Sequence, residues 1–214
     1  MIFRPETATK VAEFLLKIKA IKLQPDEPFT WASGIKSPIY CDNRITLSYP
    51  EIRTFIRQEI CDAINEMYAN PEVIAGVATG GIAQGALVAQ ELGISFCYVR
   101  SSSKGHGLQN QIEGVLESGQ DVVVIEDLVS TGMSSLDAVE ALRDRGANVK
   151  GMIAIFSYGF EATKERFEKE ECPLTILCDY DHLLTAALNT NYITEEQMES
   201  LKQWRKDPKS WKND

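Results

Sequence analysis

The fold is decided by the stretch Val122-Val123-Val124-Ile125-Glu126-Asp127-Leu128-Val129-Ser130-Thr131-Gly132-Met133-Ser134. Its first four residues, all β-branched, predict a strand covered on both faces, because such strands carry unbroken apolar runs instead of alternating ones. Two carboxylates and a short loop of hydroxyl and glycine residues follow. A helix is then predicted from Ser134 to Arg145 and is closed by Gly146. A strand, a loop and a helix in this order are the repeating unit of a parallel α/β sheet.

The same alternation of strand and helix continues on both sides of this stretch. Further strands are predicted from runs rich in Val and Ile at 73–77, 94–99, 149–156 and 174–178. Helices are predicted at 82–92 and, with many charged residues, between the last two strands. We therefore expect a parallel sheet with helices on both faces.

Smaller elements are predicted towards the two ends of the chain. Apolar residues at helical spacing over 11–18 indicate an amphipathic first helix, and Pro50 opens a second helix. Between them, two short extended runs around Gly34 predict an antiparallel piece outside the main sheet. A last helix is expected at 194–204. No internal repeat or interdomain linker is visible, so one domain is expected.

The composition excludes several classes of protein. The 214 residues are 44% hydrophobic and 25% charged, as in an ordinary globular domain. A net charge of −9 argues against a generally basic nucleic-acid binder or a polybasic membrane-surface protein. The five cysteines form no CxxC pair, so we expect reduced and mostly buried thiols. With no signal-peptide pattern and no apolar run near the ~18 residues of a membrane span, a soluble cytoplasmic protein is expected.

The loop after the central strand has the chemistry of a sugar-phosphate site. Open α/β sheets bind ligands beyond the carboxyl ends of their strands, where a helix N-terminus offers free N–H groups to a phosphate. Ser130, Thr131 and Ser134 add hydroxyl donors, and Gly132 lets the backbone come close. The two preceding carboxylates would repel a phosphate and need another partner. Sugar hydroxyls or a hydrated Mg²⁺ are the natural candidates.

Other interpretations of this motif were weighed. Taken alone, the acidic pair could merely cap a helix, but its place directly after four β-branched residues favours a ligand site. The chain has no GxxxxGK[ST] motif, which excludes a P-loop nucleotidase. It also has no GxGxxG after a strand, so a Rossmann dehydrogenase is unsupported.

Three segments carry a resemblance to a known family. Glu126–Ser134 resembles the phosphoribosyl-pyrophosphate (PRPP) signature of type I phosphoribosyltransferases. Phe29–Arg44 is similar to the N-terminal hood that covers the base in orotate phosphoribosyltransferases. Tyr98–Gly107, closing at Gln111–Gly114, resembles the mobile catalytic loop of that same family.

The resemblance implies a fold and a division of the chain. The fold would be α/β, with a Rossmann-like type I phosphoribosyltransferase core, a parallel sheet flanked by helices and a small N-terminal hood. Residues 1–214 would form a single domain, divided roughly into a hood at 1–47, a core at 48–180 and a C-terminal helical tail at 181–214.

The resemblance also implies a reaction, a Mg²⁺-dependent transfer of ribose 5-phosphate from PRPP to orotate. Its products would be orotidine 5′-phosphate and pyrophosphate, in pyrimidine synthesis. The implied catalytic residues are Arg100, Lys104, His106 and Asp127. PRPP would be bound by the three loop cations and by the residues of the signature, which are Glu126, Asp127, Leu128, Val129, Ser130, Thr131, Gly132, Met133 and Ser134.

Further implied features concern orotate, the metal and the partner. Ser130 would also contact orotate, and Mg²⁺ would be held mainly through PRPP, with no direct protein ligand. The family resemblance implies a homodimer in which the loop bearing Lys104 reaches the neighbouring active site. Neither a nucleic acid nor a membrane is expected as a partner.

One branch of the family differs from this sequence at several sites. It carries lysines where this chain has Ala32, Gly80 and Ser101, and an orotate-contacting Arg where it reads Ile155–Tyr158. This sequence resembles the other bacterial branch instead. Its turn at 78–81 would then hold pyrophosphate through backbone N–H groups.

Two rival functions were weighed against this one. A type I transferase for a purine or for uracil is disfavoured by the hood motif, since purine enzymes build that lobe differently. A regulator that senses PRPP without catalysis would be expected to lose the loop cations or gain a basic surface. His182 lies among Leu and Ala residues and is interpreted as structural.

Overall fold

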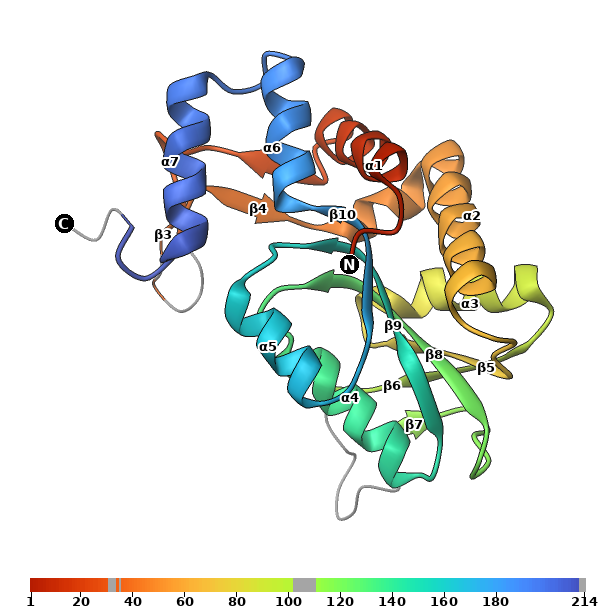
Figure 1. The fold of residues 1–214 in the computed structure, drawn as a ribbon. Helices are drawn as coiled ribbons and strands as arrows, with labels where there is room; N and C mark the ends of the chain where they lie inside the picture. The colour runs from red at the N-terminus through yellow and green to blue at the C-terminus, as the bar shows by residue number, and fades with distance from the viewer. Residues whose placement is uncertain (31–33, 35, 102–110, 212–214) are drawn as a thin grey trace.

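A mixed six-stranded sheet forms the centre of the molecule (Figure 1). The computed structural model describes residues 1–30, 34, 36–101 and 111–211. The strand order is β10-β9-β8-β5-β6-β7. The bounds are Val73–Val77 for β5, Ser95–Val99 for β6, Ile112–Glu113 for β7, Asp121–Val129 for β8, Asn148–Ser157 for β9 and Leu174–Asp179 for β10. The first five strands in this order pair in parallel, as predicted, whereas β7 is antiparallel to β6.

Helices cover both faces of this sheet (Figure 1). Their bounds are Pro5–Lys17 for α1, Pro50–Met67 for α2, Gly80–Leu92 for α3, Met133–Asp144 for α4, Glu161–Lys169 for α5, Tyr180–Asn189 for α6 and Glu195–Lys206 for α7. Val122 and Val124 contribute to the core under α4 and α5, whereas Val123 and Ile125 contribute to the core under α1, α2 and α3. Successive strand residues point to opposite faces, so covering both faces requires the unbroken apolar run.

The central strand is longer than its apolar run. The sequence predicts a strand at 122–125, but β8 continues to Val129 because β9 offers partners that far along. Leu128 pairs with Phe156, and Val129 pairs with Ser157. Glu126 and Asp127 therefore lie inside the strand, which shortens the connecting loop to 130–132. Helix α4 begins at Met133, one residue earlier than predicted.

The N-terminal lobe contains two small antiparallel sheets and a 3₁₀ helix, η1, at Asn43–Ser48. One sheet pairs β2, Phe29–Thr30, with β3, Lys36–Ser37, as predicted around Gly34. The other pairs β1, Ile21–Leu23, with β4, Ile39–Cys41. β1 has only three residues and was not predicted from the sequence. Residues 31–33 and 35, which include Ala32, lie outside the described residues.

The first helix and the C-terminal helices share a core with the sheet. Helix α1 packs against α6 and β10, and Leu15, Leu184 and Trp204 belong to the same apolar cluster as Ile125. All five cysteines are free and four are buried, which confirms the prediction of unpaired, mostly buried thiols. Among the described residues, no helix is both long and apolar enough to cross a membrane.

Candidate active site

The predicted site lies where β5, β6 and β8 end. The turn at 78–79 follows β5, Arg100 follows β6, and the loop at 130–132 follows β8. A small pocket is lined by Ala78, Arg100, Ser101 and Ser134. The structure therefore brings one of the predicted cations together with the predicted phosphate loop, although 34 positions separate Arg100 from Ser134 in the sequence (134 − 100).

The start of α3 packs directly against β8. A Cβ atom added to Gly80 would lie 2.1 Å from Cγ of Asp127, and one added to Gly81 would lie 2.3 Å from the carbonyl oxygen of Ile125. The Ala78–Thr79 peptide bond before this helix is cis. A larger residue at Gly80 would therefore require the side chain of Asp127 to move.

The two neighbouring carboxylates have different environments. The carboxylate of Glu126 is buried and accepts hydrogen bonds from Ser135 Oγ at 2.9 Å and from the backbone N–H of Asp127 at 3.1 Å. Burial, reinforced by the charge of Asp127, raises the pKa of Glu126 to about 8. The half-buried side chain of Asp127 lies instead beside Gly80 of α3. Glu126 thus ties β8 to α4, whereas Asp127 is the carboxylate on the α3 side.

The N-terminal lobe is attached to the core at this same point. Buried Asn43 donates from Nδ2 to the backbone carbonyl of Asp127 at 2.6 Å. Next to it, the guanidinium of Arg44 holds both carboxylate oxygens of Asp42, at 2.7 and 2.9 Å. Burial raises the pKa of the Asp127 carboxyl, and the charge of Arg44 is among the effects that oppose this. Asn43 belongs to the predicted hood, but this contact with β8 was not predicted from the sequence.

The phosphate loop is exposed on one side and supported on the other. Thr131, Met133 and Ser134 are exposed, whereas Gly132 is buried with a φ of +78°. That angle is in the left-handed region that favours glycine. Helix α4 begins immediately afterwards, and its first N–H groups have no partner within the helix.

The predicted loop cations are only partly described. The backbone N–H of Arg100 donates to the carbonyl of Gln111 at 2.9 Å, and Gln111 Nε2 donates back to the carbonyl of Arg100 at 2.9 Å. Nη1 of Arg100 lies 3.6 Å from Glu113 Oε1 and, among the described residues, has no hydrogen-bond partner. Lys104 and His106 lie outside the described residues.

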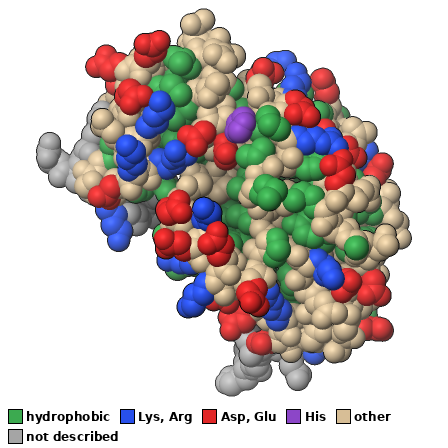
Figure 2. Space-filling model, in the orientation of Figure 1, with side chains coloured by type: hydrophobic (Ala, Val, Ile, Leu, Met, Phe, Trp, Pro, Cys, Tyr) green, Lys and Arg blue, Asp and Glu red, His purple; other side chains and the backbone are tan. Residues whose placement is uncertain are grey.

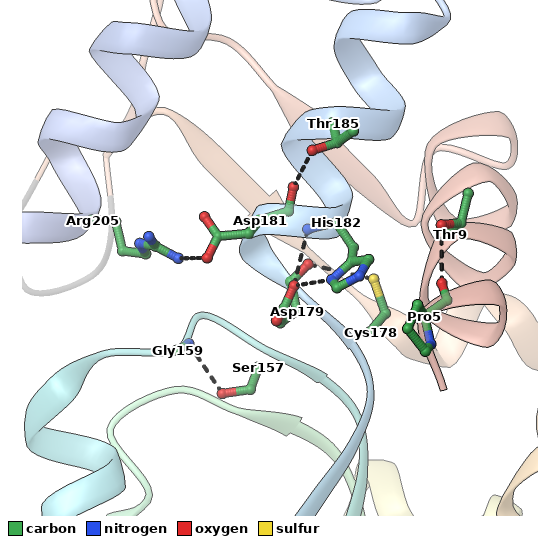
Figure 3. Close-up of polar contacts among 10 residues, drawn as sticks. All are labelled: Pro5, Thr9, Ser157, Gly159, Cys178, Asp179, Asp181, His182, Thr185 and Arg205. Atoms are coloured by element: carbon green, nitrogen blue, oxygen red, sulfur yellow. Dashed lines mark hydrogen bonds and ion pairs between the residues drawn. The ribbon is translucent and has the colours of Figure 1, made fainter. Parts of the chain in front are cut away.

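The other histidine has a structural environment (Figure 3). Asp179 caps the N-terminus of α6, accepting from the backbone N–H of His182 at 2.9 Å, and its carboxylate lies 2.8 Å from Nδ1 of the same residue. Nearby, Arg205 of α7 binds Asp181 at 2.7 Å. These contacts join helix ends and agree with the interpretation of His182 as structural.

A second cavity is lined by residues of α5 and β10. Its volume is about 780 Å³, and its lining includes Met67, Phe160, Phe167 and Ile176. Figure 2, drawn in the orientation of Figure 1, shows apolar side chains gathered in the middle of the face turned to the viewer. This cavity contains none of the predicted site residues.

Comparison with known proteins agrees with the geometry. A family model for the phosphoribosyl transferase domain matches residues 45–182. The chain is 56% identical over 201 residues to an orotate phosphoribosyltransferase of Porphyromonas gingivalis, covering 94% of this chain and 96% of that protein. The chain belongs to the orotate phosphoribosyltransferase family. A Listeria monocytogenes member of the family is 54% identical over 202 residues, covering 94% of this chain and 97% of its own.

Solved structures confirm the fold. The orotate phosphoribosyltransferase of Aeropyrum pernix superposes with a TM-score of 0.74 at 27% identity, covering 86% of this chain and 99% of that one. The UMP synthase of Leishmania donovani gives a TM-score of 0.79 at 26% identity. There, 92% of this chain matches 42% of the synthase. The predicted type I phosphoribosyltransferase fold is therefore confirmed.

Proposed function

We propose that this chain transfers ribose 5-phosphate from PRPP to N1 of orotate, a late step in pyrimidine (UMP) synthesis. The products are orotidine 5′-phosphate and pyrophosphate, which makes the enzyme a glycosyltransferase of the pentosyl class. The observation that carries the proposal is the high identity to orotate phosphoribosyltransferases over 94% of the chain. The loop at 130–134, located at the carboxyl end of the central strand, supports it.

The proposed binding of PRPP divides between the loop and Asp127. The free N–H groups at the start of α4, with the hydroxyls of Ser130, Thr131 and Ser134, suit a 5′-phosphate. Asp127 is half-buried beside the loop and suits the ribose hydroxyls. Glu126 stays a proposed partner of the ribose hydroxyls, and its carboxylate also accepts a hydrogen bond from Ser135 Oγ. In our proposal Ser130 also contacts orotate.

Catalysis is proposed to act mainly on the leaving group. As the bond from ribose to pyrophosphate breaks, negative charge grows on the pyrophosphate, and fixed cations stabilise that charge. Arg100, Lys104 and His106 are assigned this role. The position of Arg100 in the small pocket, beside Ser134 of the proposed phosphate site, supports this role. Orotate is already acidic, so holding it in line with the reacting carbon does not require a strong general base.

Mg²⁺ is proposed as the cofactor. Mg²⁺ is commonly bound by one or two carboxylates together with substrate phosphates, keeping several waters. Within the part of the chain that the structure describes, no three His, Cys, Asp or Glu side chains gather into a metal site. In our proposal the ion is held mainly through the phosphates of PRPP, beside the carboxylate of Asp127. When bound, the ion would neutralise charge on the pyrophosphate.

The proposed assembly is a homodimer with shared active sites, in the cytoplasm. The catalytic loop connects β6 to β7, and β7 is the outermost strand, so the loop leaves the sheet at its edge. This position supports a reach towards a neighbouring subunit. Free thiols fit a reducing compartment and support the cytoplasmic location.

A substrate panel tests the proposed reaction. The enzyme is incubated with PRPP, Mg²⁺ and one of orotate, uracil, adenine or hypoxanthine, and pyrophosphate release is measured. Orotate alone should support rapid turnover. Turnover of a purine base or uracil with orotate inert would overturn the assignment, and binding of PRPP without turnover of any base would favour the regulator.

A further inference from the structure

Helix α5 contacts the back of the phosphate loop through two hydrogen bonds. The Oγ1 hydroxyl of buried Thr163 donates to the backbone carbonyl of Ser130 at 2.7 Å. Nη1 of Arg166 donates to the next carbonyl, that of Thr131, at 2.8 Å. Two successive peptide carbonyls of the loop are therefore held towards the same helix, which lies beside α4 in Figure 1.

A third residue of α5 completes this contact. A Cβ atom added to Gly132 would lie 2.8 Å from Cε2 of Phe167 and 3.2 Å from Cγ2 of Thr163. Thr163, Arg166 and Phe167 have the spacing i, i+3 and i+4, so they share one face of the helix. That face supports the loop over its whole length.

Fixing these carbonyls also fixes the donors of the loop. In a trans peptide the C=O and the N–H point in opposite directions. The carbonyl of Ser130 shares a peptide with the N–H of Thr131, and the carbonyl of Thr131 shares one with the N–H of Gly132. Both N–H groups therefore point away from α5. Neither donates a hydrogen bond to another of the described residues.

We propose that Thr163 and Arg166 are positioning residues that aim the N–H groups of Thr131 and Gly132 at the 5′-phosphate of PRPP. The inference rests on the proposed function of the loop and extends it to a helix outside the PRPP signature. Without these donors the two peptides could rotate. The anion site would then lose its preorganised geometry, while the turn at 78–81, assigned to pyrophosphate, would be unaffected.

The test compares ligands that do and do not carry the 5′-phosphate. Thr163→Val is nearly isosteric but lacks the hydroxyl, Thr163→Ser retains it, and Arg166→Met removes the guanidinium. Lys164→Met, on the exposed side of the same helix, is the matched control. Calorimetry measures the Kd of ribose 5-phosphate, orotidine 5′-phosphate and pyrophosphate, and steady-state kinetics measure KM and kcat.

Thr163→Val should weaken ribose 5-phosphate and orotidine 5′-phosphate by about tenfold, as expected for loss of a buried hydrogen bond. The KM for PRPP should rise similarly, with a smaller change in kcat. Pyrophosphate binding should be unchanged, Thr163→Ser should stay within about twofold of the parent, and Lys164→Met should have no effect. Arg166→Met should also weaken the binding of ribose 5-phosphate and orotidine 5′-phosphate. It provides the test if Thr163→Val does not fold.

Two results would overturn the inference. If folded Thr163→Val and Arg166→Met bind ribose 5-phosphate as tightly as the parent, the contact is only structural. If pyrophosphate binding falls in parallel, the effect is not confined to the loop. The double variant Ser130→Ala/Ser134→Ala tests the proposed function of the loop separately from the role of α5. If it too leaves ribose 5-phosphate binding unchanged, the proposed function of the loop fails, and the inference fails with it.

Discussion

Glu126 and Asp127 show how adjacent residues of one strand acquire different environments. Because β8 continues through both of them, their side chains point to opposite faces of the sheet. Glu126 is buried against Ser135, whereas Asp127 lies beside Gly80. In the sequence the two carboxylates look equivalent. They differ in the structure because β8 extends through both residues and directs their side chains to opposite faces of the sheet.

The buried position of Glu126 predicts a pH-dependent stability. Its folded pKa of about 8 lies above the ordinary value of 4.5, so between these values the folded protein binds more protons than the unfolded chain. The free energy of unfolding should therefore fall as pH rises through this window. Each unit of pKa difference corresponds to about 1.4 kcal/mol. The free energy of unfolding, measured in urea, should therefore be lower at pH 8 than at pH 5. The contribution of this group to the difference should be a few kcal/mol, at ~1.4 kcal/mol per unit of pKa difference.

Glu126→Gln is the matching variant for this effect. It retains an acceptor for Ser135 but cannot ionise, so much of the difference in stability between the two pH values should disappear. An unchanged difference in the variant would assign the pH dependence to other groups.

Asp127→Asn should keep the fold and lose most of the activity. The change is nearly isosteric, which matters because Gly80 leaves no free space beside this side chain. Removing the charge is expected to cost ~2–4 kcal/mol of transition-state stabilisation, measured as kcat/KM with PRPP. Asp121→Asn, at the start of the same strand and paired with Lys150, is the control. Near-parental kcat/KM for Asp127→Asn would show that the carboxylate does not bind the ribose–Mg²⁺ unit.

At the scale of elements, one buried amide hydrogen bond joins η1 of the N-terminal lobe to β8. Asn43→Ala would leave the carbonyl of Asp127 without its donor from η1. We expect a loss of ~1–3 kcal/mol in the free energy of unfolding, because a buried polar group loses its partner. Asn148→Ala removes a comparable amide-to-carbonyl bond to Gly119 at the surface and should cost less. Equal losses in the free energy of unfolding would show that the bond from Asn43 stabilises the fold no more than a surface bond does.

The helices, the long strands and the short antiparallel piece around Gly34 could be predicted, but β1 and β7 could not. β1 and β7 have three and two residues, too few to display a pattern. The extension of β8 to Val129 depends on partners in β9, which the local sequence does not contain. Pairing of this kind is a tertiary property and overrides local propensity.

The site could be predicted only where its residues are contiguous. The phosphate loop follows from the order strand, loop and helix. The contacts of Asn43 with Asp127 and of Thr163 with Ser130 join residues 84 and 33 positions apart. Their residue types are ordinary for a turn and a charged helix, so no local signal distinguishes them.

At the scale of the whole molecule, the shared site of the proposed dimer can be tested by mixing two inactive variants, Lys104→Ala and Asp127→Asn. In a mixed dimer, the site on the Lys104→Ala chain keeps its own Asp127 and receives an intact loop from its partner. With random pairing, about half the dimers are mixed and each has one good site. Roughly a quarter of the parental activity should therefore return.

Subunit exchange is verified independently in the same experiment, for example with one variant carrying a size tag. If Lys104 serves its own chain, every site retains one defect. Mixing with verified exchange would then restore nothing.

The hydrogen bonds between Arg100 and Gln111 have a consequence for the edge of the sheet. They close the base of the catalytic segment in the manner of a hairpin, so the sheet is complete without the residues between them. For a segment closed in this way, even a doubling of length costs only ~0.6 kcal/mol. The register of β6 and β7 is therefore set by residues on either side of the proposed catalytic loop and not by the loop itself.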